Sequence, residues 1–425
     1  MSLFGAMFSG VSGLNAQSQS LGMISDNISN VNTVGFKATE ARFSTLVTQA
    51  ATDTSYSPGG VEAAPFSLID KQGLLESSDS ATDIAVAGKG FFVVNTRDNS
   101  AGQFLFTRAG SFTVDQNGFL KNTGGYFLQG WPTDTAGVPI AANTSIESTL
   151  STVNVSGISG VAVATSNVSL GANLPASAPT GTTENNNILI FDSLGVAHNI
   201  QITWTKTGVN AWDYAVADPT LANDASVQTA TLTAGAAGSV TFNGDGTPNT
   251  ITNPALAIDF TNPPATATGA AAGAITLDLG TAGSADGVTQ FSGNFTTSFI
   301  QQNGVQFGIF TGVTIGEDGL VTATFDNGET RPIYKVPLAT FANPSRLEAK
   351  SGNAYAQTDR SGQTLLNFAD ELDSSRIASG ALESSNVDLG EEFTKMVITQ
   401  QAYSAASRII TTADEMLDEL VRIIR

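Results

Sequence analysis

The sequence predicts a mainly β protein with helical termini, in which nested all-β domains, barrel-like or sandwich-like, are inserted between N- and C-terminal coiled-coil helices. Three observations support this fold class. Apolar residues recur every seven positions at both ends of the 425-residue chain. Short apolar runs between those ends are separated by Asn-Gly and Asp-Gly turns. The central region is rich in Thr, Ala, Ser, Gly and Asn, a composition that favours strands over helices.

The C-terminal segment 388–425 contains the clearest repeat. Its heptad positions are Leu389, Met396, Tyr403, Ile410, Leu417 and Ile424, and a companion row three residues on includes Ala406, Ala413 and Leu420. Asp388 is a candidate N-cap, and Glu391 suits a capping box. A helix over this segment would be roughly 55 Å long, and its one-sided apolar stripe requires a partner surface.

The N-terminal segment 1–31 mirrors this pattern and supplies the partner. Gly5, Gly10, Gly13 and Gly22 lie within the predicted helix, where each glycine costs about 1 kcal/mol relative to Ala. We therefore expect disordered ends in the free monomer and helices in an assembly; an ordinary two-helix hairpin within one monomer is the alternative. The predicted self-assembly seam consists of Met7, Val11, Leu14, Leu21, Ile24, Ile28, Leu389, Met396, Tyr403, Ile410, Leu417, Leu420 and Ile424.

The domain organisation is predicted to be nested. Strand patterns begin at Asp83 and give way to a stretch richer in small and polar residues. The same pattern of short apolar runs and Gly-containing turns resumes at Val321. The segment from Thr39 to Val47 is either a second helix or an extended arm. The predicted parts are a terminal coiled-coil domain (1–31 plus 388–425), connecting segments (32–82 plus 345–387), a β domain (83–147 plus 294–344) and an outer inserted β domain (148–293).

Charge and composition exclude several partners. The formal net charge is -20, and between Asn122 and Thr330 the chain has fifteen carboxylates against one cation, Lys206. Nucleic acid and anionic membranes both require clustered cations, so neither is an expected partner. Without cysteine, the chain has no disulfide or thiolate chemistry. No segment is predicted to insert into a membrane or to act as a conventional secretory signal, which by itself favours a cytoplasmic protein.

No pattern points to catalysis, a cofactor or a metal. His198 is the only histidine and shares a strand face with Ile200 and Ile202, so we interpret it as a core or edge residue. Gly88-Lys89-Gly90 lacks the spacing of a phosphate-binding loop and is a predicted turn. The Asp-Gly pairs do not match a calcium loop. We expect no enzyme activity.

Several motifs resemble those of the bacterial flagellar axial proteins of the rod and hook. Ile24 to Lys37 resembles the N-terminal signature of that family, and Asp83 to Phe92 resembles a second motif. Ala339 to Pro344, Gly380 to Asp388 and Gln400 to Leu417 are similar to its C-terminal half. The motif residues carried over are Asn27, Asn30, Asn32, Gly35, Phe36, Gly88, Gly90, Phe91, Phe92, Asn386 and Asp388. The large insert favours the hook branch of the family over a distal rod subunit.

This resemblance implies a structural subunit that polymerises into a flexible hollow tube, joins rod to filament and transmits motor torque as a universal joint. It implies a homo-oligomer that contacts the distal rod, the hook–filament junction proteins, the hook assembly cap and the flagellar export apparatus. It also implies an extracellular location reached without signal-peptide cleavage. Head-to-tail contacts between identical subunits generate such a helical polymer, with the paired helices lining the tube and the acidic insert outermost. A secreted β-rich adhesin or carbohydrate-active enzyme is the alternative from another class.

The glycine content of the N-terminal helix generates a first prediction. Limited proteolysis of dilute monomer should remove both chain ends before it cuts the β domains, because the ends obtain their stability from packing in the assembly. Mass spectrometry of the first fragments measures this order. Ends that resist cleavage for as long as the β domains would contradict the prediction.

Overall fold

The structure is a computed structural model that describes residues 3–46, 59–99, 101–252, 255–261, 268–369 and 375–423. The chain divides into two compact units. Unit 1 comprises residues 1–157, 313–323 and 331–425, and unit 2 comprises residues 158–312 and 324–330. Strands predominate among the regular elements of the described residues, with a helix near each end of the chain, which confirms the predicted fold class. The finer four-part division stays a prediction.

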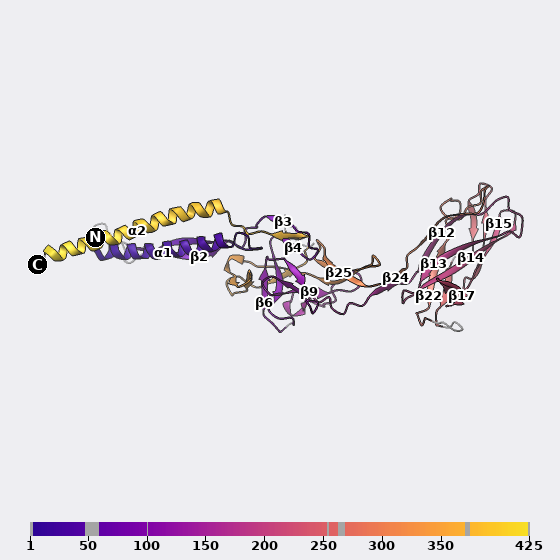
Figure 1. Cartoon of the computed structure of the whole chain (residues 1–425), viewed down its shortest axis with the longest axis horizontal. Helices are drawn as coiled ribbons and strands as arrows, with labels where there is room; N and C mark the ends of the chain where they lie inside the picture. Colours follow the sequence, from indigo (N-terminus) through magenta and orange to yellow (C-terminus); the bar gives the residue numbers. More distant parts are fainter. Residues whose placement is uncertain are drawn as a thin grey trace. The chain divides into compact units, whose positions relative to one another are not determined.

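The terminal helices of unit 1 are α1 (Leu3–Ser29) and α2 (Leu389–Ile423). They pack against each other along their length, as the indigo and yellow ribbons of Figure 1 show. The Asp388 carboxylate caps α2, because its Oδ1 accepts hydrogen bonds from the backbone N–H groups of Gly390 at 2.8 Å and Glu391 at 3.2 Å. The predicted N-cap is therefore confirmed.

A hairpin follows α1 and packs against it. Strand β1 (Thr39–Leu46) pairs antiparallel with β2 (Gly60–Ser67), with Thr39 opposite Ser67. The Arg42 guanidinium lies 3.2 Å from the centroid of the Phe66 ring, a cation–π contact that adds to the pairing. Of the alternatives for this segment, the extended arm is correct for the described residues and the second helix is wrong.

The β part of unit 1 is assembled from segments before and after the insert. β5 pairs with β28, β6 with β30, β4 with β32, and β3 with β33. This explains why strand signals resume late in the sequence. The strands are β3 (Leu75–Ser77), β4 (Ile84–Gly88), β5 (Phe91–Asn95), β6 (Phe104–Thr107), β7 (Phe112–Val114), β8 (Leu120–Asn122), β9 (Phe127–Pro132), β10 (Ser151–Thr152), β28 (Leu338–Thr340), β29 (Glu348–Lys350), β30 (Ala354–Ala356), β31 (Leu365–Asn367), β32 (Ser375–Ser379) and β33 (Ala381–Glu383), with short 3-10 turns at Glu147–Thr149 and Pro344–Arg346.

Strands β25 (Phe310–Ile315), β26 (Leu320–Phe325) and β27 (Thr330–Lys335) each contain residues of both units. Within unit 1, one sheet runs in the order β27-β9-β5-β6-β30-β29. Its core includes Phe91, Phe106 and Trp131, all at most 2% exposed. Phe341 packs edge-on against Phe106 with ring centroids 4.7 Å apart. Gly88 and Gly90 have φ values of 105° and 126°, as the predicted turn between β4 and β5 requires.

Unit 2 is a sandwich of two sheets around one core. One sheet has the order β18-β21-β22-β12-β23, and the other has the order β17-β16-β14-β15-β19-β20 with β13 paired to β14. Both contribute to a core that includes Trp204, Trp212 and Leu277. The strands are β11 (Val161–Val163), β12 (Asn167–Asn173), β13 (Thr183–Phe191), β14 (Ala197–Gly208), β15 (Ala211–Val216), β16 (Thr220–Leu221), β17 (Asp224–Gln228), β18 (Thr231–Ala234), β19 (Ala237–Phe242), β20 (Pro248–Ile251), β21 (Ala255–Asp259), β22 (Gly273–Asp278), β23 (Thr296–Gln302) and β24 (Val305–Gly308).

His198 is fully buried in this core. Of its two predicted placements, core or edge, the core is therefore correct. Its Nδ1 lies 2.6 Å from the Thr229 hydroxyl, and its Nε2 lies 3.1 Å from Asp192 Oδ2. Burial alone would raise the pKa of Asp192, but hydrogen bonds from the Val196 backbone and from His198 outweigh it and lower that pKa. Both ring nitrogens of His198 therefore have partners within the sandwich, and the site is closed to solvent.

Candidate assembly surface

The contact between α1 and α2 is made largely by small residues. The buried positions of α1 include Gly10, Ala16 and Ser20, and those of α2 include Thr399 and Ala413. A Cβ atom added at Gly10 would lie 3.0 Å from Ile410 Cγ1, and one at Gly13 would lie 3.7 Å from Ala406 Cβ. The glycines that weaken α1 as an isolated helix thus allow α2 to approach it closely.

The predicted seam residues are distributed unevenly around this contact. Ile24 is buried, at 4% exposed, whereas Val11, Leu389 and Tyr403 are 40–48% exposed. Several lie half-buried: Met7, Leu14, Leu21, Ile28, Met396, Ile410 and Leu417. The side chain of Leu420 and the whole of Ile424 fall outside the described residues. On α2, Ile410 of the heptad row and Ala406 of the companion row both approach α1, whereas Leu389 and Tyr403 of the heptad row are still accessible.

Large apolar side chains cover the outer faces of the helix pair. The most exposed is Phe4, at 74%. Monomeric soluble proteins rarely leave so many large apolar groups in contact with water on one pair of helices, so this surface has the character of an interaction site. We call it the apolar helix surface, and its members are Phe4, Phe8, Val11, Phe393, Val397, Ile398, Tyr403, Ile409, Met416 and Val421.

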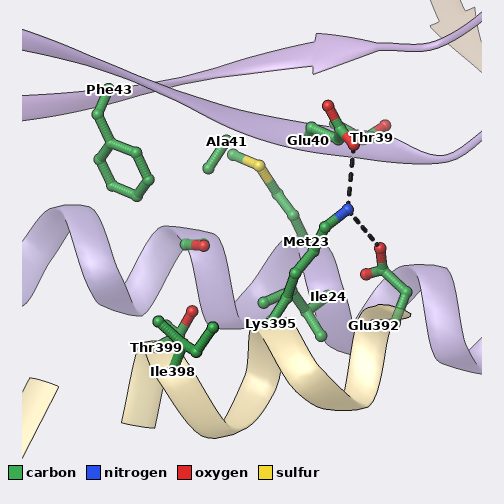
Figure 2. A pocket seen from close by; sticks show the side chains of 11 residues that line it. Met23, Ile24, Thr39, Glu40, Ala41, Phe43, Glu392, Lys395, Ile398 and Thr399 are labelled. Atoms are coloured by element: carbon green, nitrogen blue, oxygen red, sulfur yellow. Dashed lines mark hydrogen bonds and ion pairs between the residues drawn. The ribbon is translucent and has the colours of Figure 1, made fainter. Parts of the chain in front are cut away.

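A polar network connects α1, α2 and β1 at one end of the pair. The Asn27 amide group donates hydrogen bonds of 3.0 Å to Glu392 on α2 and to the Thr39 carbonyl on β1, and its Oδ1 accepts from the Thr39 N–H. The Lys395 ammonium lies 3.0 Å from Glu40, 2.9 Å from Glu391 and 3.1 Å from Glu392. Figure 2 shows Lys395 between Glu40 and Glu392.

The same elements enclose a small pocket next to this network. Its volume is about 270 Å³, and Met23, Ile24, Phe43 and Ile398 form its apolar wall. Burial would lower the pKa of Lys395, but hydrogen bonds to Glu391, Glu40 and Glu392 together raise it above its ordinary value. Lys395 therefore stays charged and holds β1 against α2 at ordinary pH.

A buried charge cluster lies where the two ends of the chain meet the sheet. Glu383 is fully buried and pairs with Lys37 at 2.5 Å and with Arg108 at 3.1 Å. The Gly73 backbone N–H donates to the same carboxylate at 2.8 Å, and the Gly35 N–H donates to the Glu383 carbonyl at 2.7 Å. Because burial outweighs the attraction of Glu383, the pKa of Lys37 is lowered.

Motif residues surround this cluster. The Asn386 amide accepts from the Ala38 N–H at 2.7 Å and donates to the carbonyls of Leu68 and Lys71. Gly35 has a φ of 68°, and a Cβ there would lie 2.6 Å from the Ala109 nitrogen. Asn30 closes the end of α1 by donating to the Asp26 carbonyl at 2.9 Å.

The other motif residues have simpler environments. Phe91 and Phe92 are buried, Phe36 is half-buried, and Asn32 is exposed. Lys37 and Glu383 belong to the quoted motifs, yet sequence reasoning did not identify them as partners. Arg108, Glu392 and Lys395 were also missed. The signal available for the first pair was that Lys37 is the single cation of its motif and that Glu383 follows the small and apolar residues Ala381 and Leu382.

Metal and membrane functions find no support among the described residues. No group of three or more His, Asp or Glu side chains in the part of the chain that the structure describes is placed to hold a metal ion. Over the same part, neither helix combines the length and apolar character of a membrane span.

Family comparisons identify the class of protein as a flagellar rod or hook axial protein. The model of the flagella basal body rod protein matches residues 7–37, and that of the flagellar basal body rod FlgEFG protein C-terminal region matches residues 378–423. The flagellar hook protein FlgE/F/G D1 domain matches residues 85–161. The flagellar basal body protein FlaE D2 domain matches residues 163–305.

Full-length relatives narrow this class. The chain is 36% identical to the flagellar hook protein FlgE of Rhizobium meliloti, with complete coverage of both chains. It is 30% identical to that of Caulobacter vibrioides and 34% identical to that of Brucella suis, again over both whole chains. The chain therefore belongs to the flagellar hook protein family and is a structural subunit of the hook. These relatives favour the hook over the distal rod and over a secreted adhesin or enzyme.

The buried charge cluster generates a prediction about stability. Glu383→Ala leaves Lys37 and Arg108 buried without their counter-charge, so it should lower the free energy of unfolding of unit 1 by about 3–5 kcal/mol. Urea unfolding measures the change. The matched control is Glu348→Ala, which breaks the exposed pair with Lys350 and should cost at most about 1 kcal/mol. Equal losses of unfolding free energy in the two variants would contradict the assignment of Glu383 as the buried counter-charge of Lys37 and Arg108.

The close helix contact generates a second prediction. Gly10→Leu inserts a side chain against Ile410 and should destabilise the α1–α2 contact by about 1–3 kcal/mol. Thermal unfolding followed by helical circular dichroism measures this effect. Gly22→Leu is the control, because a Cβ at Gly22 meets nothing within 4 Å. If Gly22→Leu loosened the helices as much as Gly10→Leu, close approach at Gly10 would not be the reason for the glycine.

Proposed function

We propose that copies of this chain polymerise head to tail through the apolar helix surface into a hollow, flexible tube that joins rod to filament and transmits torque. The observation that carries the proposal is that the inner and outer faces of the helix pair have side chains of different size. Small residues such as Gly10 and Ala413 make the contact within the chain, whereas larger apolar side chains such as Phe4, Val397 and Met416 face outward.

Burial of this surface between subunits would contribute free energy to assembly. Full burial of one Val, Leu, Phe or Met side chain contributes about 1.5–3 kcal/mol, and each subunit presents several of them. Repeated contacts of one kind between identical subunits produce a helical filament when their geometry does not close into a ring. The predicted seam residues that remain accessible, including Tyr403 and Leu389, would take part in the same contacts.

The remaining parts of the function follow from family membership and form part of the proposal. The tube would contact the distal rod, the hook–filament junction proteins and the hook assembly cap. Subunits would reach it through the flagellar export apparatus without cleavage of a signal peptide, and would work outside the cell. The chain would act as a structural element without enzyme activity.

Polymerisation tests the proposal. Val397→Asp places a charge on the apolar helix surface at a residue that is 53% exposed, so it should leave the monomer folded but raise the critical concentration for assembly about tenfold or more. Leu417→Asp should also block polymerisation. Sedimentation and electron microscopy of the pelleted material measure the result.

The matched control is Gln401→Asp, which adds the same charge at an exposed polar position one turn further along α2. It should change the critical concentration by less than about threefold, because it removes no apolar contact. Normal tubes from Val397→Asp, or an equal loss with Gln401→Asp, would overturn the assignment of this surface.

A further inference from the structure

Two of the residues that line a second pocket in unit 1 each have a buried polar atom that the protein leaves without a partner. Its volume is about 440 Å³, within the range of small-molecule sites. Arg108 and Ser375 line it, and they are only 2% and 1% exposed. Arg108 Nε and Ser375 Oγ both lack a hydrogen-bond partner, and a buried polar group left in this state costs free energy. Two such atoms in residues that line one pocket are candidate donors to a ligand.

The unpaired Arg108 Nε–H is held in a fixed direction. The other guanidinium nitrogens are engaged: Nη1 donates to Glu383 at 3.1 Å, and Nη2 donates to the Gly88 carbonyl at 2.8 Å. The guanidinium carbon also lies 5.2 Å from the centroid of the Phe91 ring. These contacts fix the guanidinium, so the free Nε–H offers a donor whose orientation costs little entropy when a ligand binds.

The Ser375 hydroxyl is positioned by the sheet. Its backbone lies opposite Gly88 in the pairing of β32 with β4, close to the carbonyl that accepts from Arg108. A hydroxyl can donate to the same acceptor that Arg108 Nε–H reaches. One carboxylate can use both donors, because each of its oxygens accepts hydrogen bonds.

The rest of the lining selects for an anion on an apolar stem. Lys89 is exposed at the rim and makes no ion pair with any residue that the structure describes, whereas Phe341 and Pro344 supply an apolar wall. Asp70 also lines the pocket and opposes a second negative charge. A monoanion with an aromatic or aliphatic body fits this combination better than a phosphate dianion or an uncharged apolar molecule.

We propose that this pocket is a carboxylate-binding site, in which Arg108 Nε–H and Ser375 Oγ–H hold the carboxylate, Lys89 attracts it, and Phe341 packs against its apolar stem. The ligand is either a free monocarboxylate or an acidic side chain of a second copy of this chain. Binding to the unassembled chain does not depend on the apolar helix surface, so this proposal and the proposed function can fail separately.

The test uses the full chain, kept unassembled at low concentration, with 4-fluorophenylacetate as the probe and ¹⁹F NMR as the readout. The carboxylate should bind saturably, and the uncharged 4-fluorophenylacetamide should bind at least about tenfold more weakly. Ser375→Ala should weaken binding about tenfold by removing one donor to a charged group. Lys89→Gln should weaken it about two- to threefold at low salt.

Lys71→Gln is the matched control, because it removes an exposed cation that does not line the pocket. It should leave the affinity unchanged. Urea unfolding of each variant checks that the fold is intact. If neither probe binds, if amide and carboxylate bind equally, or if Ser375→Ala has no effect on binding, the two groups are simply left unpaired in the protein and the proposal is overturned.

A second arm distinguishes the source of the carboxylate. If assembled polymer still binds the probe with the affinity of the free chain, the site serves a free monocarboxylate. If assembly excludes the probe and Ser375→Ala raises the critical concentration, an acidic side chain of a second copy occupies the site. Either result presupposes the carboxylate binding measured on the unassembled chain.

Discussion

The buried carboxylate of Glu383 is the interaction on which the architecture of unit 1 depends. It lies near the C-terminal end of the chain, yet its partners are Lys37, which follows α1, and Arg108, from the sheet. One carboxylate between two buried cations is stable only when all the partners are present, because each charge left alone would bear the full cost of desolvation. The junction therefore joins three distant segments at once, and both terminal helices extend from it.

The helix pair makes one kind of contact within the chain and presents a different surface for contacts between subunits. Close packing within the chain requires small side chains where the helices approach, and Gly10, Gly13 and Ala406 provide them. The large apolar side chains are thereby left on the outer faces, where burial has to come from other subunits. This arrangement fits a hook subunit, since a polymer needs a surface that is unsatisfied in each separate copy.

The two units obtain their stability in different ways. Unit 2 has a continuous sandwich core around Trp204 and Trp212, and even its single histidine is enclosed with Asp192 as a partner. Unit 1 pairs strands from both sides of the insert, so its sheet depends on contacts remote in sequence. Unit 1 also contains Arg108, which stabilises the junction through Glu383, lines a pocket and has one buried N–H without a partner.

The sequence by itself determined the features that depend on local pattern. Heptad spacing located both terminal helices to within a few residues, Asp388 marked the start of α2, and Gly88 and Gly90 marked a turn because they tolerate positive φ. Quoted motifs were sufficient to recognise the hook and rod family. Local pattern did not decide between helix and strand for Thr39–Leu46, because that segment has no clear period.

Only the tertiary structure decided which residues of α2 approach the partner helix and which charges are buried. Ile410 and Ala406, from two different rows of α2, approach α1 because Gly10 and Gly13 make room for them, and no periodicity within α2 reveals those glycines. Glu383 is unremarkable in sequence, and its role appears only when folding brings Lys37 and Arg108 to it from positions far away in the chain. Burial of a charge depends on partners that meet in three dimensions, and a linear pattern does not contain that information.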